Sequence, residues 1–172
     1  MDTLTRGIVY LARKAVSHYL RHRCPLPCPA NLPDSLKQRA GAFVSIKCKG
    51  TLRGCIGTLE PQQDTLAAEI IENAVKAATK DPRFDPVTEG ELDDLTFSID
   101  VLTPLEPVSD ISMLDPKRYG LVVRNDKKQG VLLPDLEGVP TIAEQVRLCR
   151  LKGGFTDEDT EEYFRFRVQR FR

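Results

Sequence analysis

Residues 41–58 read Gly-Ala-Phe-Val-Ser-Ile-Lys-Cys-Lys-Gly-Thr-Leu-Arg-Gly-Cys-Ile-Gly-Thr, and this stretch decides the fold. Its first half alternates apolar and more polar side chains, which is typical of a strand with one buried face. Residues 49–51 predict a turn, and residues 52–58 predict the returning strand of a hairpin. The glycines of the returning strand indicate a bulge or a close approach to the backbone.

The pleat of the returning strand determines which side chains lie on the same face as Cys55. In a regular pleat, Arg53 and Cys55 share one face, opposite Leu52 and Ile56. A nearby guanidinium favours a thiolate over a thiol. The glycines leave Cys55 open to a ligand, which makes it a candidate nucleophile. The alternative is that Cys55 is a small buried hydrophobic side chain in a tightly packed strand.

The rest of the chain alternates helices with strands and hairpins. Apolar residues recur at helical spacing over residues 4–20 and 65–80, and prolines make residues 24–34 an extended connector. Further elements are predicted over residues 95–101 (strand), 120–133 (hairpin), 142–153 (helix) and 163–169 (strand). Hairpins imply antiparallel pairing, so the predicted fold class is α+β, a mainly antiparallel sheet flanked by helices.

Length and composition restrict the class of protein. The chain has 172 residues, of which 41% are hydrophobic and 29% charged, as expected for one globular domain over residues 1–172. No run approaches the roughly 18 apolar residues of a membrane span. The first residues lack the pattern of a signal peptide, and five cysteines are an odd number, so we expect a reducing cytoplasm, no disulfide framework and no membrane.

Charge is unevenly distributed although the net charge is zero. Residues 1–53 carry ten basic and two acidic side chains, whereas residues 54–115 carry three basic and fourteen acidic ones. Such blocks can orient a charged partner. The alternative is that the acidic block is a solvated helix with its loops.

A second candidate cluster follows the second helix. Pro82 fixes the backbone between Asp81 and Arg83. An arginine in a rigid turn can present its planar fork to a carboxylate or a phosphate. The alternative is an ion pair between the two residues that ties the loop to the body of the protein.

The hexapeptide Leu52-Arg53-Gly54-Cys55-Ile56-Gly57 resembles the signature of the AMMECR domain family. Other blocks agree in order with that family over residues 40–170, namely Gly41–Val44, Ala77–Phe84, Glu91-Leu92, Tyr119-Gly120, Leu132–Pro134 and Leu151–Gly154. The resemblance implies an α+β fold in two lobes, with the hexapeptide near a cleft. The family's motif residues correspond here to Arg53, Gly54, Cys55, Gly57, Asp81, Arg83 and Phe84.

The resemblance also implies a biological setting. Prokaryotic members of the family resemble the A component of the AmmeMemoRadiSam system, which is associated with a Memo-like protein and a radical SAM protein. We therefore expect a component of a modification pathway whose cleft around Cys55 binds or attacks a small or anionic substrate. The alternatives are a non-enzymatic adaptor, in which the hexapeptide is structural, and an RNA-associated protein.

A weak metal-site candidate lies near the N-terminus. His18 and His22 share a helix face, and Cys24 and Cys28 follow closely. The prolines between the two cysteines restrict the turn that would bring both sulfurs to one ion, and the spacing matches no usual structural zinc pattern. Surface histidines and incidental cysteines are the alternative.

Nucleic-acid binding and cofactor binding have little support. Residues 163–167, Tyr-Phe-Arg-Phe-Arg, interleave aromatic and cationic side chains that could stack bases and contact phosphates, with Arg170 and Arg172 following. The alternative is an amphipathic strand with Phe164, Phe166 and Val168 in the core. The sequence lacks P-loop, GxGxxG, GxSxG, HExxH and CxxC motifs, so no cofactor is predicted.

Overall fold

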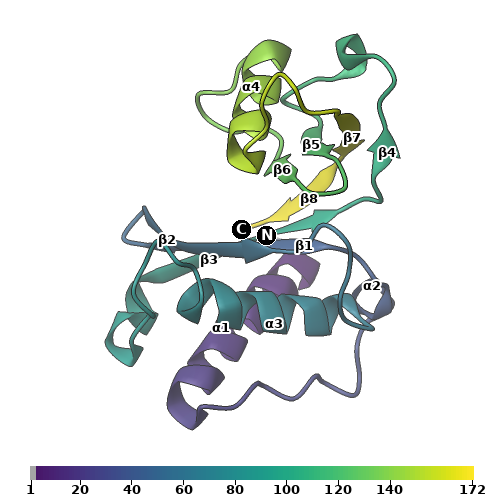
Figure 1. The fold of residues 1–172 in the computed structure, drawn as a ribbon. Coiled ribbons are helices and arrows are strands. Elements are labelled where there is room, and N and C mark those ends of the chain that lie inside the picture. The colour runs from purple at the N-terminus through teal and green to yellow at the C-terminus, as the bar shows by residue number, and fades with distance from the viewer. Residues whose placement is uncertain (1–2) are drawn as a thin grey trace. The chain divides into compact units, whose positions relative to one another are not determined.

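The computed structural model describes residues 3–172, with side chains from residue 5 onward, and the chain divides into two compact units. The first unit comprises residues up to 102 together with residues 169–172, and the second comprises residues 103–168. Both units contain an antiparallel sheet and helices (Figure 1), so the predicted α+β class is confirmed. No helix in the described part of the chain is long and apolar enough to cross a membrane.

The sheet of the first unit has the strand order β2-β1-β3-β8. Its strands are β1 (Ala42–Cys48), β2 (Thr51–Gly57), β3 (Leu95–Leu102) and β8 (Val168–Phe171). Helices α1 (Thr3–His22) and α3 (Leu66–Thr79) pack on one face of this sheet (Figure 1). Ala42, Val44 and Ile46 point from β1 into this core and are 0% exposed.

The first hairpin forms as the sequence predicts. β1 and β2 are joined by the two-residue turn of Lys49 and Gly50, whose φ angles are 50° and 85°. A two-residue hairpin turn with positive φ at both positions matches the right-handed twist of its strands. Glycine adopts this conformation without the steric cost of a Cβ.

Helix α3 and the segment that follows it also form as local sequence signals predict. The side chain of Thr65 accepts a hydrogen bond from the backbone of Ala68 and caps α3, which ends before Pro82. Thr88 and Glu91 form the expected capping box at the start of the 3₁₀ helix η1 (Glu89–Asp94). Between α1 and β1, the described residues form one regular element, α2 (Asp34–Lys37).

The sheet of the second unit has the order β4-β7-β5-β6, and helix α4 (Ile142–Gly153) packs against β5 and β6. Its strands are β4 (Glu106–Pro107), β5 (Gly120–Arg124), β6 (Gln129–Leu132) and β7 (Glu162–Phe166), and the 3₁₀ helix η2 spans Ile111–Met113. Leu121, Val123, Leu132 and Cys149 are buried in its core.

The prediction of one strand over residues 163–169 is wrong. The chain forms β7 in the second sheet and β8 in the first, and the two strands meet at Arg167. Arg167 leaves the β7 ladder because its backbone N–H donates to the Thr103 hydroxyl at 2.9 Å and its carbonyl accepts from the Thr103 backbone at 3.0 Å. An aromatic and cationic alternation alone does not reveal such a change of partner.

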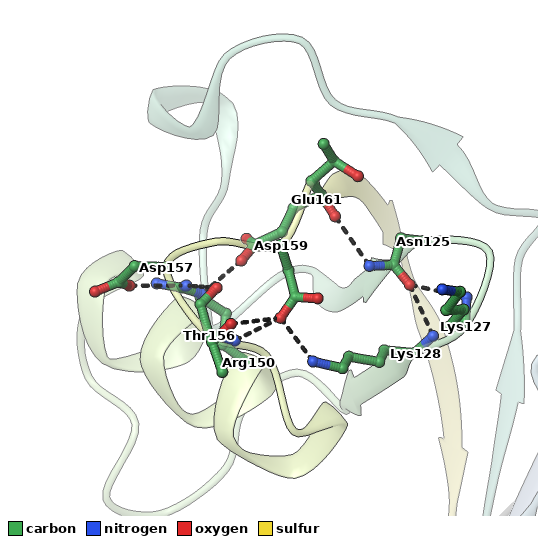
Figure 2. A network of polar contacts seen from close by, with 9 residues as sticks. Asn125, Lys127, Lys128, Arg150, Thr156, Asp157, Asp159 and Glu161 are labelled. Carbon is green, nitrogen blue, oxygen red and sulfur yellow. Dashed lines mark hydrogen bonds and ion pairs between the residues drawn. The ribbon is translucent and has the colours of Figure 1, made fainter.

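A polar network holds the last loop of the second unit in place (Figure 2). Asp159 accepts hydrogen bonds from the backbone and hydroxyl of Thr156 and pairs with Lys128 at 2.7 Å. The hydrogen bond from Lys128 is the main cause that lowers the pKa of Asp159 to about 2. Arg150 of α4 pairs with Glu161 and Asp157. The network therefore ties residues 156–161 to α4 and to the β5–β6 turn.

Candidate functional site

A β-bulge in the first hairpin sets the orientation of Cys55. Next to the turn, Lys47 lies opposite Leu52, but farther along Ser45 lies opposite Cys55. This register leaves Arg53 as the extra residue of β2, without a partner of its own. The pleat is therefore not regular, and Leu52 shares a face with Cys55 instead of lying opposite to it.

The bulge moves the thiol from one face of the sheet to the other. If the register next to the turn continued unchanged, Cys55 would lie opposite Val44, which points into the core and is 0% exposed. Because a shift of one residue exchanges the two faces of a strand, the bulge places Cys55 on the face away from α1 and α3. The glycines of the motif predicted such an irregularity.

The thiol lies in a row of small polar side chains. Ser45 donates its hydroxyl hydrogen to the Sγ of Cys55 at 3.2 Å. Ser98 of β3 lies opposite Ser45, on the far side of β1 from Cys55. All three residues are half-buried. We call this row, Cys55-Ser45-Ser98, the thiol row.

Asp81 connects the outer edge of β2 to a cation. The backbone N–H of Cys55 donates to Oδ2 of Asp81 at 2.9 Å, and Nη2 of Arg83 donates to the same oxygen at 2.7 Å. Asp81 is 5% exposed, and its hydrogen bond with Arg83 is the main cause that holds its pKa below the usual range. The same hydrogen bond is the main cause that raises the pKa of Arg83.

Arg83 is both an ion-pair partner and an exposed cation. Its Nε binds the second oxygen of Asp81 at 2.9 Å, so the pair is bidentate within one turn. The side chain of Arg83 is nevertheless 56% exposed, and its guanidinium lies 5.4 Å from the ring centroid of Phe84. The cluster expected from sequence therefore assembles as an internal ion pair whose cation still faces solvent.

Arg53 has a different environment from Arg83. Its Nε binds Glu91 at 2.7 Å, and its two terminal nitrogens donate to the carbonyls of Asp85 and Pro86 at 2.7 and 3.3 Å. The Arg53 side chain is 19% exposed, and its hydrogen bond is the main cause that lowers the pKa of Glu91 to about 2. Arg53 therefore fastens the bulge to η1 and to the segment before it, which leaves Arg83 as the solvent-facing cation of the two.

The two glycines of the motif allow close packing. A Cβ on Gly54 would lie 2.0 Å from the carbonyl oxygen of Ala77 in α3, and one on Gly57 would lie 2.2 Å from the ring of Phe43. No L-amino acid with a side chain fits against α3 at the first position without moving backbone atoms. Gly54 therefore brings β2 against the helix that precedes Asp81.

The N-terminal histidines and cysteines do not form one cluster. Nε2 of His18 lies 3.6 Å from Sγ of Cys24, and the rings of His18 and His22 are 4.5 Å apart. Sγ of Cys28 instead lies 3.9 Å from the hydroxyl of Thr65. Over the described residues, no group of three or more His, Cys, Asp or Glu side chains is arranged to hold a metal ion. All five cysteines are free thiols.

The aromatic residues of the last strand pair are largely covered. Phe166 is 1% exposed, and the guanidinium of Arg124 lies 4.0 Å from the ring centroid of the half-buried Phe164. Phe166 therefore lies in the core, and a guanidinium lies over the Phe164 ring.

Sequence reasoning did not identify Ser45 and Ser98 as parts of the site. Both serines interrupt strongly apolar strands and lie on their polar faces, which was a visible signal. Their relation to Cys55 depends on the register of three strands. That register could not be assigned without the exact position of the bulge.

Comparisons with known proteins identify both a family and individual relatives of this chain. A sequence model of the AMMECR1 family matches residues 9–172. A protein from Thermotoga maritima is 48% identical over 164 residues, which cover 94% of each chain. Protein CA_C1420 from Clostridium acetobutylicum is 40% identical over 167 residues, but the match spans only 35% of that protein.

A solved structure has the same fold. The crystal structure of the uncharacterized protein PH0010 from Pyrococcus horikoshii matches with a TM-score of 0.91 at 29% identity. The match covers 99% of this chain and 91% of that chain. The match to the family model confirms the resemblance seen in the hexapeptide.

Proposed function

This chain belongs to the AMMECR1 family, and from that premise we propose that Cys55 is the reactive thiol of a modification pathway. In this proposal Cys55 reacts with, or carries, a small anionic substrate group that Arg83 positions. The observation that carries the proposal is the hydrogen bond from Ser45 to the Cys55 sulfur, on a strand whose edge is held by Asp81 and Arg83.

Two groups are placed to act on the sulfur as it reacts. A hydroxyl donor stabilises charge that develops on an acceptor atom, and a nearby guanidinium does so through space. Arg83 and the backbone of Cys55 bind the same oxygen of Asp81, which fixes the cation near the thiol. Because more than half of the Arg83 side chain is exposed, it can also bind the substrate's anionic group.

These residues support covalent attachment of a substrate group to the Cys55 sulfur, without a base of the protein to take the thiol proton. The sulfur donates an electron pair to an electrophilic carbon, and the leaving group departs with the pair of the broken bond. Within the described residues, the side chain that binds the Cys55 sulfur is Ser45, whereas Asp81 binds the Cys55 backbone N–H, and neither is a histidine. The thiol proton therefore goes to solvent, and the arrangement favours a carrier or acceptor thiol over a Cys-His hydrolase.

Site-resolved alkylation of the native protein tests the proposal. Peptide mass spectrometry reports all five cysteines in one experiment, so their rates are compared directly. We expect Cys55 to react faster than the more exposed Cys24 and Cys28, and Arg83→Gln to slow only Cys55. If Cys55 reacts more slowly than both exposed thiols, and Arg83→Gln leaves its rate unchanged, the reactive-thiol proposal is wrong.

Partner proteins are part of the same proposal. We propose Memo-like and radical SAM proteins as the partners, as the family resemblance implies. The Clostridium relative supports a partner protein, because about two thirds of that chain lies outside the match and could supply a second functional part. Co-purification of the tagged protein from its own cells tests this: recovery of neither class of partner would count against the pathway.

Five free thiols also support a reducing, cytoplasmic location.

A non-enzymatic adaptor is the second candidate function. The packing of Gly54 on α3 and the anchoring of Arg53 to Glu91 explain much of the hexapeptide as structure. In that case, Cys55→Ser keeps the full activity of the reconstituted pathway, because only packing is required at that position. Loss of activity in Cys55→Ser, with an unchanged melting temperature, favours the reactive thiol.

A further inference from the structure

Three arginines surround one tyrosine in the second unit. The guanidinium carbons of Arg165, Arg167 and Arg118 lie 4.4, 5.2 and 5.6 Å from the ring centroid of Tyr119. Arg167 also donates from Nη2 to the Tyr119 hydroxyl at 3.1 Å. We call these four residues the arginine-tyrosine cluster.

The tyrosine is a fixed platform for these cations. Tyr119 is 7% exposed, and its carbonyl accepts a hydrogen bond at 2.8 Å from Gln145, a buried residue of α4. The backbone of Arg167 is held by the hydroxyl of Thr103. Cations over an aromatic face gain electrostatic stabilisation, which offsets part of the repulsion among the three arginines.

The protein balances only part of the positive charge of the cluster. Arg165 pairs with Glu106 through Nε at 2.9 Å and donates from Nη1 to the Met113 carbonyl at 3.1 Å, so two of its three nitrogens are engaged. Within the described residues, Glu106 is the one carboxylate that forms an ion pair with a member of the cluster. Arg118 and Arg167 are both exposed. Three guanidiniums and one carboxylate leave two positive charges at one surface position.

We propose that the arginine-tyrosine cluster binds the phosphate group of a small phosphorylated molecule. A phosphate monoester carries a charge of about −1.5 to −2 at neutral pH, which matches the excess charge of the cluster. Arg118 and Arg167 supply planar forks for its oxygens, and Arg165 adds charge while it stays paired with Glu106. A single carboxylate needs only one such fork, so the cluster fits a dianion better. The inference does not depend on the role of Cys55.

Calorimetric titration of the full chain tests this site. The probes are inorganic phosphate and glycerol phosphate, with glycerol as the uncharged control, at an ionic strength of about 0.1 M, where the Debye length is about 10 Å. The double variant Arg118→Gln/Arg167→Gln removes the proposed forks. The control variant Lys127→Gln/Arg147→Gln removes two positive charges elsewhere in the same unit. Melting temperatures confirm that both variants are folded.

We expect both phosphates to bind and glycerol not to bind. The cluster variant should lose at least tenfold in affinity, whereas the control variant should stay within twofold of the unmodified protein. The proposal is overturned if the two variants bind phosphate equally, because general positive charge then explains binding. It is also overturned if an RNA oligonucleotide binds and neither phosphate competes with it, because the ligand is then a nucleic acid.

Discussion

Ser45 donates its hydroxyl hydrogen to the sulfur of Cys55 across the β1–β2 pair, at 3.2 Å. A net hydrogen bond of this kind is worth about 0.5–1.5 kcal/mol, which corresponds to a two- to tenfold change in rate when it acts on the reacting form. We therefore expect Ser45→Ala to slow alkylation of Cys55 by that factor at fixed pH. Ser98→Ala is the matched control, because Ser98 lies in the same row one strand farther away. Equal rates in the two variants would remove Ser45 from the site.

Gly54 should be intolerant of any side chain. A Cβ there would lie 2.0 Å from a backbone oxygen of α3, so Gly54→Ala must separate β2 from the helix. Overpacking of this kind lowers the free energy of unfolding by about 1–3 kcal/mol. We expect a value near the upper end because the clash is with backbone atoms, which cannot rotate away. Gly7→Ala is the control, since nothing lies within 4 Å of a Cβ there and alanine favours the interior of a helix. Chemical denaturation should show a loss for the first variant and a small gain for the second.

The Arg53–Glu91 pair should contribute to acid sensitivity. The pKa of Glu91 is lowered from 4.5 to about 2 in the folded protein, so the unfolded chain binds more protons between these values. Stability from this pair is therefore present above pH 4.5 and is lost as the pH falls toward 2. Glu91→Gln should cost about 1–3 kcal/mol at neutral pH, because Arg53 loses its charged partner. Its stability should also fall less steeply below pH 4.5, and parallel pH curves would contradict this assignment.

The network of Figure 2 gives a corresponding prediction for the second unit. The pKa of Asp159 is lowered to about 2, chiefly by Lys128, so its contribution is present above pH 4 and is lost as the pH falls. Asp159→Asn should loosen residues 156–161 and increase their hydrogen exchange at neutral pH. Asp126→Asn, an exposed aspartate of the neighbouring turn, serves as control and should leave that exchange unchanged.

Local signals in the sequence predicted most of the elements but not the pairing around Cys55. Alternation over residues 41–48, the cap at Thr65 and the capping box at Thr88 depend on neighbours in the chain, and all three form as expected. The hydrogen bond from the Cys55 backbone to Asp81 joins residues 26 positions apart. It depends on the bulge, on α3 and on the packing of Gly54, which no local pattern specifies. For the same reason, no local pattern predicts that the last strand breaks at Arg167, where the backbone binds the distant Thr103.

Cys149 should report opening of the second unit. It is 0% exposed, and burial is the main cause that raises the pKa of its thiol to about 11. Alkylation of Cys149 therefore requires opening of the core around it, and its rate should follow the stability of that unit. Gly130→Ala would place a Cβ 1.9 Å from the Cys149 carbonyl oxygen and should accelerate its alkylation at least tenfold. Gly90→Ala, which meets no atom within 4 Å, is the control. If Cys149 reacts at the same rate in both variants, its protection does not depend on the contact between β6 and α4.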